Sequence, residues 1–183
     1  TTTTTTTTTS GGTTTTVTFS TTTSTVVSEG RTFTVQNVDH TGSRIGNIYT
    51  SLALDKIDNN KAHISYYHRV NEDLRYAVGS PGAWSISAID TTGDVGMYSS
   101  IALDSNNRVH MSYYAPRDSA LAYISEEAEY WVLATVDDPI DADVGYYSSI
   151  ALDSNNKVHI CYYDWDNKDL KYATNKSGVW TIE

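Results

Sequence analysis

Three histidines stand at matching positions in this 183-residue chain. His63, His110 and His159 lie 47 and 49 residues apart. Imidazole nitrogens are good zinc ligands, and three that converge on one point make a metal site. Each of these histidines, however, is expected within a strand beside Ser and Tyr hydroxyls, which can hydrogen-bond a neutral ring. We therefore predict structural histidines and expect neither a metal nor another cofactor.

Three aspartates precede the histidines, each after a leucine and before an Asn pair: Asp55, Asp104 and Asp153. Carboxylate and amide oxygens bind calcium, but calcium loops carry more carboxylates than these segments do. An aspartate at the entry of a turn also accepts hydrogen bonds from the backbone N–H groups that follow it. We predict this hairpin-capping role for all three.

The elements that position these residues repeat along the chain. "SSIALDSNNRVHMSYY" (99–114) returns as "SSIALDSNNKVHICYY" (148–163), and "TSLALDKIDNNKAHISYY" (50–67) is a more divergent copy. Trp84, Trp131 and Trp180 repeat at the same two intervals. Repeats of about 40–50 residues built from short strands are typical of propeller blades, whereas helical repeats carry apolar stripes with a 3.6-residue period. We find no such stripe.

Each repeat contains four runs of alternating residues. In the third copy, Val158, Ile160 and Tyr162 share one face of a strand. The clusters "DSNNK", "DWDNKD" and "NKSG" separate the runs and are typical of hairpin turns. The sequence thus predicts an all-β fold with three four-stranded antiparallel blades, at about 46–93, 94–142 and 143–183. In each Tyr–Tyr pair the two rings point to opposite faces of the sheet; one is expected in the core, and the other is a candidate for a sugar-stacking platform.

The string "YSSIALDSNN", followed by "VH", "YY", "LKYAT" and Trp, resembles the blade repeat of secreted microbial β-propellers, and more distantly the Asp-box propellers of the sialidase type. It covers about residues 33–183. Sialidase-like chemistry would require clustered arginines and a Tyr/Glu nucleophile pair, but the arginines share no repeated setting. The pairs Asp137–Asp138 and Glu126–Glu127 fall in loop-like stretches and are interpreted as solvated surface rather than as acid and base. We expect no enzyme.

Composition excludes two classes of partner. The net charge is −10, and the 12 Lys and Arg residues are scattered, which disfavours a nucleic-acid partner. No apolar run reaches the length of a membrane span. The one cysteine, Cys161, has no partner for an internal disulfide and replaces Ser65 and Ser112 of the other repeats. It is predicted to be a small core residue.

Residues 1–30 form a Thr-rich extension before the repeat domain at 31–183. Such low-complexity tracts are typical of O-glycosylated stalks of exported proteins, which favours an extracellular or cell-surface location. The candidate O-glycosylation sites are Thr13, Thr14, Thr15 and Thr16. Asn175, in the sequon "NKS" on an expected hairpin tip, is a candidate N-glycosylation site.

The extension also contains strand-like alternation. Val17 and Phe19 alternate with threonine, which predicts either a strand that requires another sheet or an unstructured linker. Phe33 and Val35 belong to "RTFTVQNVDHTG" (31–42), which aligns with "AWSISAIDTTG" (83–93) and adds a further copy of the tryptophan strand. We assign Val17, Phe19, Phe33 and Val35 to an assembly strand.

Three blades are too few for a closed propeller, which typically contains four to eight blades. Unpaired edges would remain as templates for association. Three arrangements would cover these edges: two chains that form one ring, a filament in which each subunit donates its N-terminal strand to the next, or a longer protein of which this chain is a piece. The sequence favours a non-enzymatic structural subunit that forms a homopolymer through its N-terminal strand. The alternative is a carbohydrate-binding propeller on a glycosylated stalk.

Overall fold

The computed structural model of the protein describes residues 6–10, 13–17, 24–28, 31–39, 49–58, 61–128 and 130–183. Its chain divides into two compact units, Thr1–Thr41 and Gly42–Glu183. The described residues contain strands and turns but no helix, and therefore no helix that could cross a membrane. This architecture confirms the predicted all-β class.

The N-terminal unit contains two separate antiparallel hairpins: β1 (Thr6–Ser10) with β2 (Thr13–Val17), and β3 (Ser24–Ser28) with β4 (Arg31–Val35). Val17 pairs with Thr6, Phe33 with Val26, and Val35 with Ser24. Phe19 lies outside the described residues. The candidate assembly residues that are described thus pair within their own hairpins, and strand donation to another chain stays a prediction.

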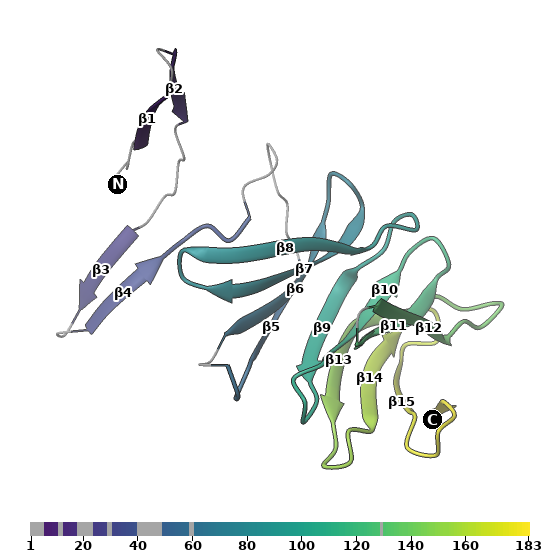
Figure 1. Cartoon of the computed structure of the whole chain (residues 1–183). Helices are drawn as coiled ribbons and strands as arrows, with labels where there is room; N and C mark the ends of the chain where they lie inside the picture. The colour runs from purple at the N-terminus through teal and green to yellow at the C-terminus, as the bar shows by residue number, and fades with distance from the viewer. Residues whose placement is uncertain are drawn as a thin grey trace. The chain divides into compact units, whose positions relative to one another are not determined.

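The second unit is made of three four-stranded antiparallel sheets, as the repeats predict (Figure 1). We call them the first, second and third blades. The first contains β5 (Thr50–Leu54), β6 (Ala62–His68), β7 (Asp73–Ser80) and β8 (Ala83–Asp90); the second contains β9 (Met97–Leu103), β10 (Val109–Ala115), β11 (Ala120–Glu127) and β12 (Tyr130–Asp137); the third contains β13 (Val144–Leu152), β14 (Val158–Asp164), β15 (Asp169–Thr174) and β16 (Thr181–Ile182).

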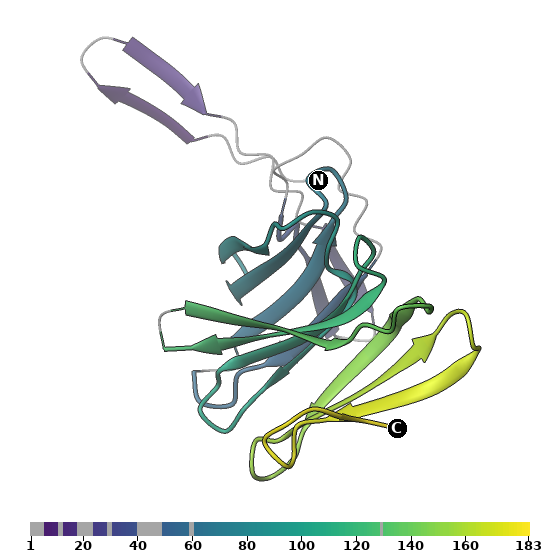
Figure 2. The same ribbon diagram turned by 90° about the vertical axis from the view of Figure 1, so that its right-hand side faces the viewer.

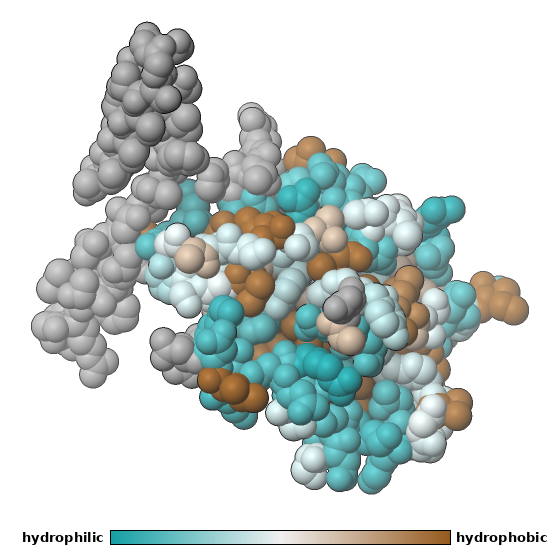
Figure 3. All heavy atoms as spheres, viewed as in Figure 1, coloured by the Kyte–Doolittle hydropathy of each residue, from teal (hydrophilic) through white to brown (hydrophobic). Residues whose placement is uncertain are grey.

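The strands pair in chain order within each blade, as a meander. Among the first strands of the blades, β9 contacts both β5 and β13. Figure 2 shows the three sheets of this unit fanned face to face, with the yellow-green third blade at one edge. In Figure 3, hydrophilic residues cover most of the visible face of these blades, and hydrophobic residues form small separate patches.

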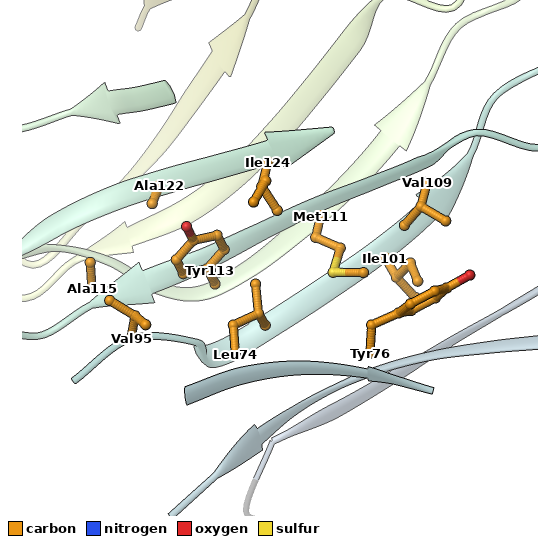
Figure 4. Close-up of a cluster of buried hydrophobic side chains, with 10 residues drawn as sticks. All are labelled: Leu74, Tyr76, Val95, Ile101, Val109, Met111, Tyr113, Ala115, Ala122 and Ile124. Carbon is orange, nitrogen blue, oxygen red and sulfur yellow. The ribbon is translucent and has the colours of Figure 1, made fainter. Parts of the chain in front are cut away.

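Apolar side chains between the blades form the core. Leu74 of the first blade packs with Ile101, Met111 and Tyr113 of the second, all buried (Figure 4). An equivalent cluster joins the second and third blades through Leu121, Ile150, Ile160 and Tyr162. Because each strand alternates, one face of a blade packs on the blade before it and the other on the blade after it.

The same polar contacts recur at the two junctions. Ser65 Oγ lies 3.0 Å from Ser99 Oγ at the first, and Ser112 Oγ lies 2.9 Å from Ser148 Oγ at the second. The Tyr113 hydroxyl donates to Asp90 (2.7 Å), as the Tyr162 hydroxyl donates to Asp137 (2.6 Å). The Ile101 N–H donates to Ser51, as the Ile150 N–H donates to Ser100.

Two expectations about burial and one about secondary structure are wrong. Cys161 is exposed, because no described part of the chain covers its face of the third blade. Asp137 is buried rather than solvated, because Tyr162 and Lys171 bind its carboxylate. Glu126 and Glu127 belong to β11 rather than to a loop. In the Tyr–Tyr pairs, both rings of the first two copies are buried, and the second hydroxyl of each pair bonds to an aspartate.

Candidate functional site

Each repeated histidine forms the centre of a Tyr–His–Asp set. The hydroxyls of Tyr76, Tyr123 and Tyr172 lie 2.5–2.6 Å from Nδ1 of His63, His110 and His159. On the other side of each ring, Nε2 lies 3.9 Å from Asp55, Asp104 or Asp153. The three rings therefore bind within their own blades. In the described part of the chain no three His, Cys, Asp or Glu residues come close enough to hold a metal.

Two of these histidines make the fold sensitive to acid. Burial lowers the pKa of His63 and of His110 below the ordinary value of 6.5, and the nearby Asp55 and Asp104 carboxylates oppose this only partly. The folded chain thus binds these protons less readily than the unfolded chain does. Their contribution to stability is complete above the ordinary pKa and decreases as the pH falls through it.

We therefore expect a lower thermal midpoint at about pH 5.5 than at about pH 7.5. The His110→Gln variant, which does not titrate in this range, should show a smaller decrease than the unaltered chain. Thermal unfolding followed by circular dichroism measures both. Equal midpoints at the two pH values would contradict the assignment of buried neutral histidines.

The repeated aspartates also cap the turns that follow the first strand of each blade. Asp104 Oδ1 accepts the N–H groups of Asn106 and Arg108, and Asp153 Oδ1 those of Asn155 and Lys157. Burial tends to raise the pKa of Asp104, but these hydrogen bonds and the Arg108 guanidinium hold it below its ordinary value. The backbone bond from Lys157 likewise lowers the pKa of Asp153.

Amide side chains connect these turns. Asn107 Nδ2 donates to Asp55 (2.5 Å), and Asn156 Nδ2 donates to Ser105 (2.8 Å). The three turns surround a cavity of about 450 Å³, whose polar lining includes Asp104, Asp153 and Ser154. Oδ1 of Asp104 and Oδ1 of Asp153 each accept two backbone N–H groups, and Asp104 Oδ2 accepts the Arg108 guanidinium, so these atoms are engaged in holding the turns. The cavity thus has a structural rather than a chemical character.

A row of tyrosines occupies the opposite end of the inner strands. Tyr98 lies between Tyr49 and Tyr147, with ring centroids 4.0 and 4.4 Å away. Tyr98 and Tyr147 have positive φ angles of 52° and 53°, and the pairing register shifts beside each of them. Such bulges redirect side chains out of the regular alternation. Here they bring the rings together around a shallow cavity of about 310 Å³.

Beside this row, at the junction of the second and third blades, lies an aromatic–carboxylate cluster, which we define as Tyr114, Asp143, Tyr146, Trp165 and Asp166. Asp143 Oδ1 accepts the hydroxyl of Tyr114 (2.6 Å), and its Oδ2 accepts that of Tyr146 (2.8 Å). The Asp143 N–H donates to Asp166 (2.9 Å), and its carbonyl accepts the N–H of Trp165 (2.8 Å).

The rings of this cluster make a continuous surface. Tyr146 lies 4.3 Å from Tyr114 and 5.2 Å from Trp165 between ring centroids, the latter pair being tilted by 30°. Trp165 is exposed and Tyr146 is half-buried. The ammonium group of Lys168 lies 4.5 Å from the Trp165 ring centroid. The exposed Trp165 thus lies beside two carboxylates, with one cation over its ring.

The cluster is suited to hydrogen bonding rather than to covalent chemistry. Burial raises the pKa of Tyr114 and of Tyr146, and the Asp143 carboxylate raises both further. Both hydroxyls therefore stay protonated near neutral pH and donate hydrogen bonds. A tyrosine nucleophile would need the opposite shift.

The first junction carries only a reduced version of the cluster. The Tyr67 hydroxyl donates to Asp94 (2.8 Å), as Tyr114 does to Asp143. The positions of Tyr146 and Trp165 are occupied there by Met97 and Pro116. Tyr146 and Trp165 do not belong to the Tyr–Tyr pairs. A platform built from the second tyrosine of each pair would therefore lack these two rings. Their departure from the repeat was the available signal for finding them.

Comparisons with known proteins concern the fold. No protein-family model and no curated protein matches the chain. Among solved structures, a fucose lectin from Kordia zhangzhouensis in complex with methyl-fucoside is similar, with a TM-score of 0.53 and 16% identity over 73% of this chain and 96% of that one. A mutant of AofleA from Arthrobotrys oligospora, in which three arginines are replaced by alanine, is also similar, with a TM-score of 0.56 and 15% identity over 83% of this chain.

The match spans 48% of the AofleA chain, so this chain covers about half of that protein's length. Likeness at such low identity concerns the fold alone. Together with the three meander sheets and their inner strands, it defines the class as β-propeller-like.

Proposed function

We propose that this protein is a non-enzymatic, carbohydrate-binding propeller that acts outside the cell or at its surface. The observation that carries the proposal is the aromatic–carboxylate cluster. Sugar rings present C–H faces that pack on aromatic rings and hydroxyls that bond to carboxylates, and the cluster offers both within one exposed surface. The similarity in fold to a fucose lectin supports this function over that of a filament subunit.

The proposed ligand is a pyranose with one apolar face. Trp165 and Tyr146 supply the stacking surface, Asp143 and Asp166 are the carboxylates of the same cluster that would accept sugar hydroxyls, and the Lys168 ammonium lies over the Trp165 ring. We do not limit the sugar to fucose. The AofleA mutant has three arginines replaced at regular intervals along its chain, whereas the arginines of this chain recur at no repeat interval.

A glycan array probed with the full chain, followed by calorimetry on the best ligand, tests the proposal. Trp165→Ala should weaken binding about tenfold, which corresponds to about 1.4 kcal/mol. Asp143→Asn should also weaken it, because the hydroxyls of Tyr114 and Tyr146 lose their charged acceptor. The bound glycan should be recovered unchanged.

Tyr130→Ala is the matched control, because Tyr130 is an exposed aromatic residue on β12 outside the cluster. It should bind as the unaltered chain does. An array without any glycan ligand, or equal binding by the Trp165 and Tyr130 variants, would overturn the proposal. The filament hypothesis and the O-glycosylated stalk at Thr13–Thr16 draw no support from the comparisons and stay predictions.

A further inference from the structure

Residues that are buried in the first two blades are exposed in the third. Leu74 and Leu121 are both 0% exposed, yet Leu170, at the same position of the third blade, is 80% exposed. Ser65 and Ser112 are fully buried, whereas Cys161 is exposed. In the first two blades the following blade covers these positions. The outer face of the third blade is therefore a blade-binding surface without a cover among the described residues (Figure 2).

The first blade shows the complementary exposure on its opposite face. Ile101 and Ile150 are 6% and 8% exposed, but Leu52, at the same position of β5, is 59% exposed. Ser99 and Ser148 are buried by their serine partners, whereas the equivalent Thr50 is exposed. In the second and third blades, the equivalent face packs against the preceding blade.

Each recurrent junction contact has two partners. One of them is present on the exposed face of the third blade, and the other on the exposed face of the first. Ser51 and Ser100 accept the N–H groups of Ile101 and Ile150, and the next serine in the series, Ser149, is exposed. The equivalent N–H donor is that of Leu52. Likewise, Cys161 stands where Ser65 and Ser112 meet a hydroxyl of the next blade, and Thr50 supplies the equivalent hydroxyl.

We infer that the exposed face of the third blade binds the exposed face of the first blade of a second copy of this chain. The two junctions within the chain define the geometry of the contact, which repeats the rotation from one blade to the next. Three blades from each of two copies make six, which lies within the four to eight blades with which propellers typically close. Such a pair would close one ring through two identical junctions.

A cross-link between copies tests this contact directly. At both internal junctions the paired side-chain oxygens are only 2.9–3.0 Å apart, so a cysteine at position 50 would face Cys161 of the second copy closely enough to form a disulfide. The Thr50→Cys variant of the full chain, oxidised mildly and run on a non-reducing gel, should give one reducible species of twice the 20.1 kDa chain mass.

Two controls accompany the cross-link. Thr50→Cys combined with Cys161→Ser removes one partner and should give no such species. Ser177→Cys places a second thiol on the exposed turn before β16, outside the inferred contact, and should cross-link far less. A ladder of higher multiples from Thr50→Cys would overturn closure at two copies. Cross-linking no greater than that of Ser177→Cys would overturn the contact.

Light scattering on the chain without added cysteines gives an independent measurement. The unaltered chain should have twice its single-chain mass, and Leu170→Asp should shift it to one chain with an unchanged β spectrum, because Leu170 contributes little to the fold of its own chain. Ile140→Asp, at a fully exposed loop position, is the control and should leave the mass unchanged. A single-chain mass for the unaltered protein would overturn the inference.

The inference does not depend on carbohydrate binding. The aromatic–carboxylate cluster lies at a junction within one chain, so the single-chain Leu170→Asp variant should retain its sugar affinity per site. Loss of assembly without loss of binding would separate the two proposals.

Discussion

Gly145→Val should destabilise the protein by about 3 kcal/mol or more, in the range of a severe packing defect. Gly145 has a φ of +106°, and a Cβ atom there would lie 2.9 Å from Leu121 Cα and 3.0 Å from the Ala120 carbonyl oxygen. Both contacts are with backbone atoms, which cannot move aside without separating the second and third blades. The free energy of unfolding, from urea denaturation followed by tryptophan fluorescence, measures the loss.

Gly178→Val provides the matched control. Gly178 also has a positive φ, +87°, but nothing lies within 4 Å of a Cβ atom built on it. Valine at position 178 would therefore introduce backbone strain of about 1–2 kcal/mol but no steric collision. An equal loss for the two variants would mean that strain alone acts at Gly145, and that the blades are not in tight contact at this point.

The two glycines differ because Gly145 meets another blade and Gly178 does not. The same difference separates the features that the sequence predicts from those that it does not. The hairpin turns depend on neighbouring residues, so clusters such as "NKSG" predict them correctly. Close contact between Gly145 and Leu121 depends on how one blade lies on the next. Burial of Cys161 was predicted wrongly for this reason: its alternation in β14 is regular, and only the following blade would determine whether it is covered.

The candidate site was predictable only in part. The repeated tyrosines gave the positions of Tyr67 and Tyr114 on successive blades, and with them a plausible platform. Tyr146 and Trp165 occupy positions where the second repeat has Met97 and Pro116, so a search for residues that recur passes over them. Asp143 lies in the connection between blades, where a carboxylate is interpreted as solvated surface until Tyr114 and Tyr146 are placed beside it.

The buried pair of Asp90 and Tyr113 should contribute strongly to the first junction. The Tyr113 ring is fully buried and its hydroxyl donates to Asp90 Oδ2 (2.7 Å), while Asp90 Oδ1 accepts both the N–H and the hydroxyl of Thr92. Asp90→Ala removes the acceptor for all three donors and leaves the tyrosine hydroxyl buried without it. We expect a loss of about 2–4 kcal/mol in the free energy of unfolding.

Tyr113→Phe should cost less, about 1–2 kcal/mol, because the ring keeps its packing and Asp90 keeps the two bonds from Thr92. In the double variant, the Tyr113 hydroxyl is absent and is no longer buried without its acceptor, while the two Thr92 donors still lose theirs. Its loss should therefore be smaller than the sum of the two single losses, by about 1 kcal/mol or more, as double-mutant cycles find for residues in contact. Strict additivity would contradict a coupled pair of Asp90 and Tyr113.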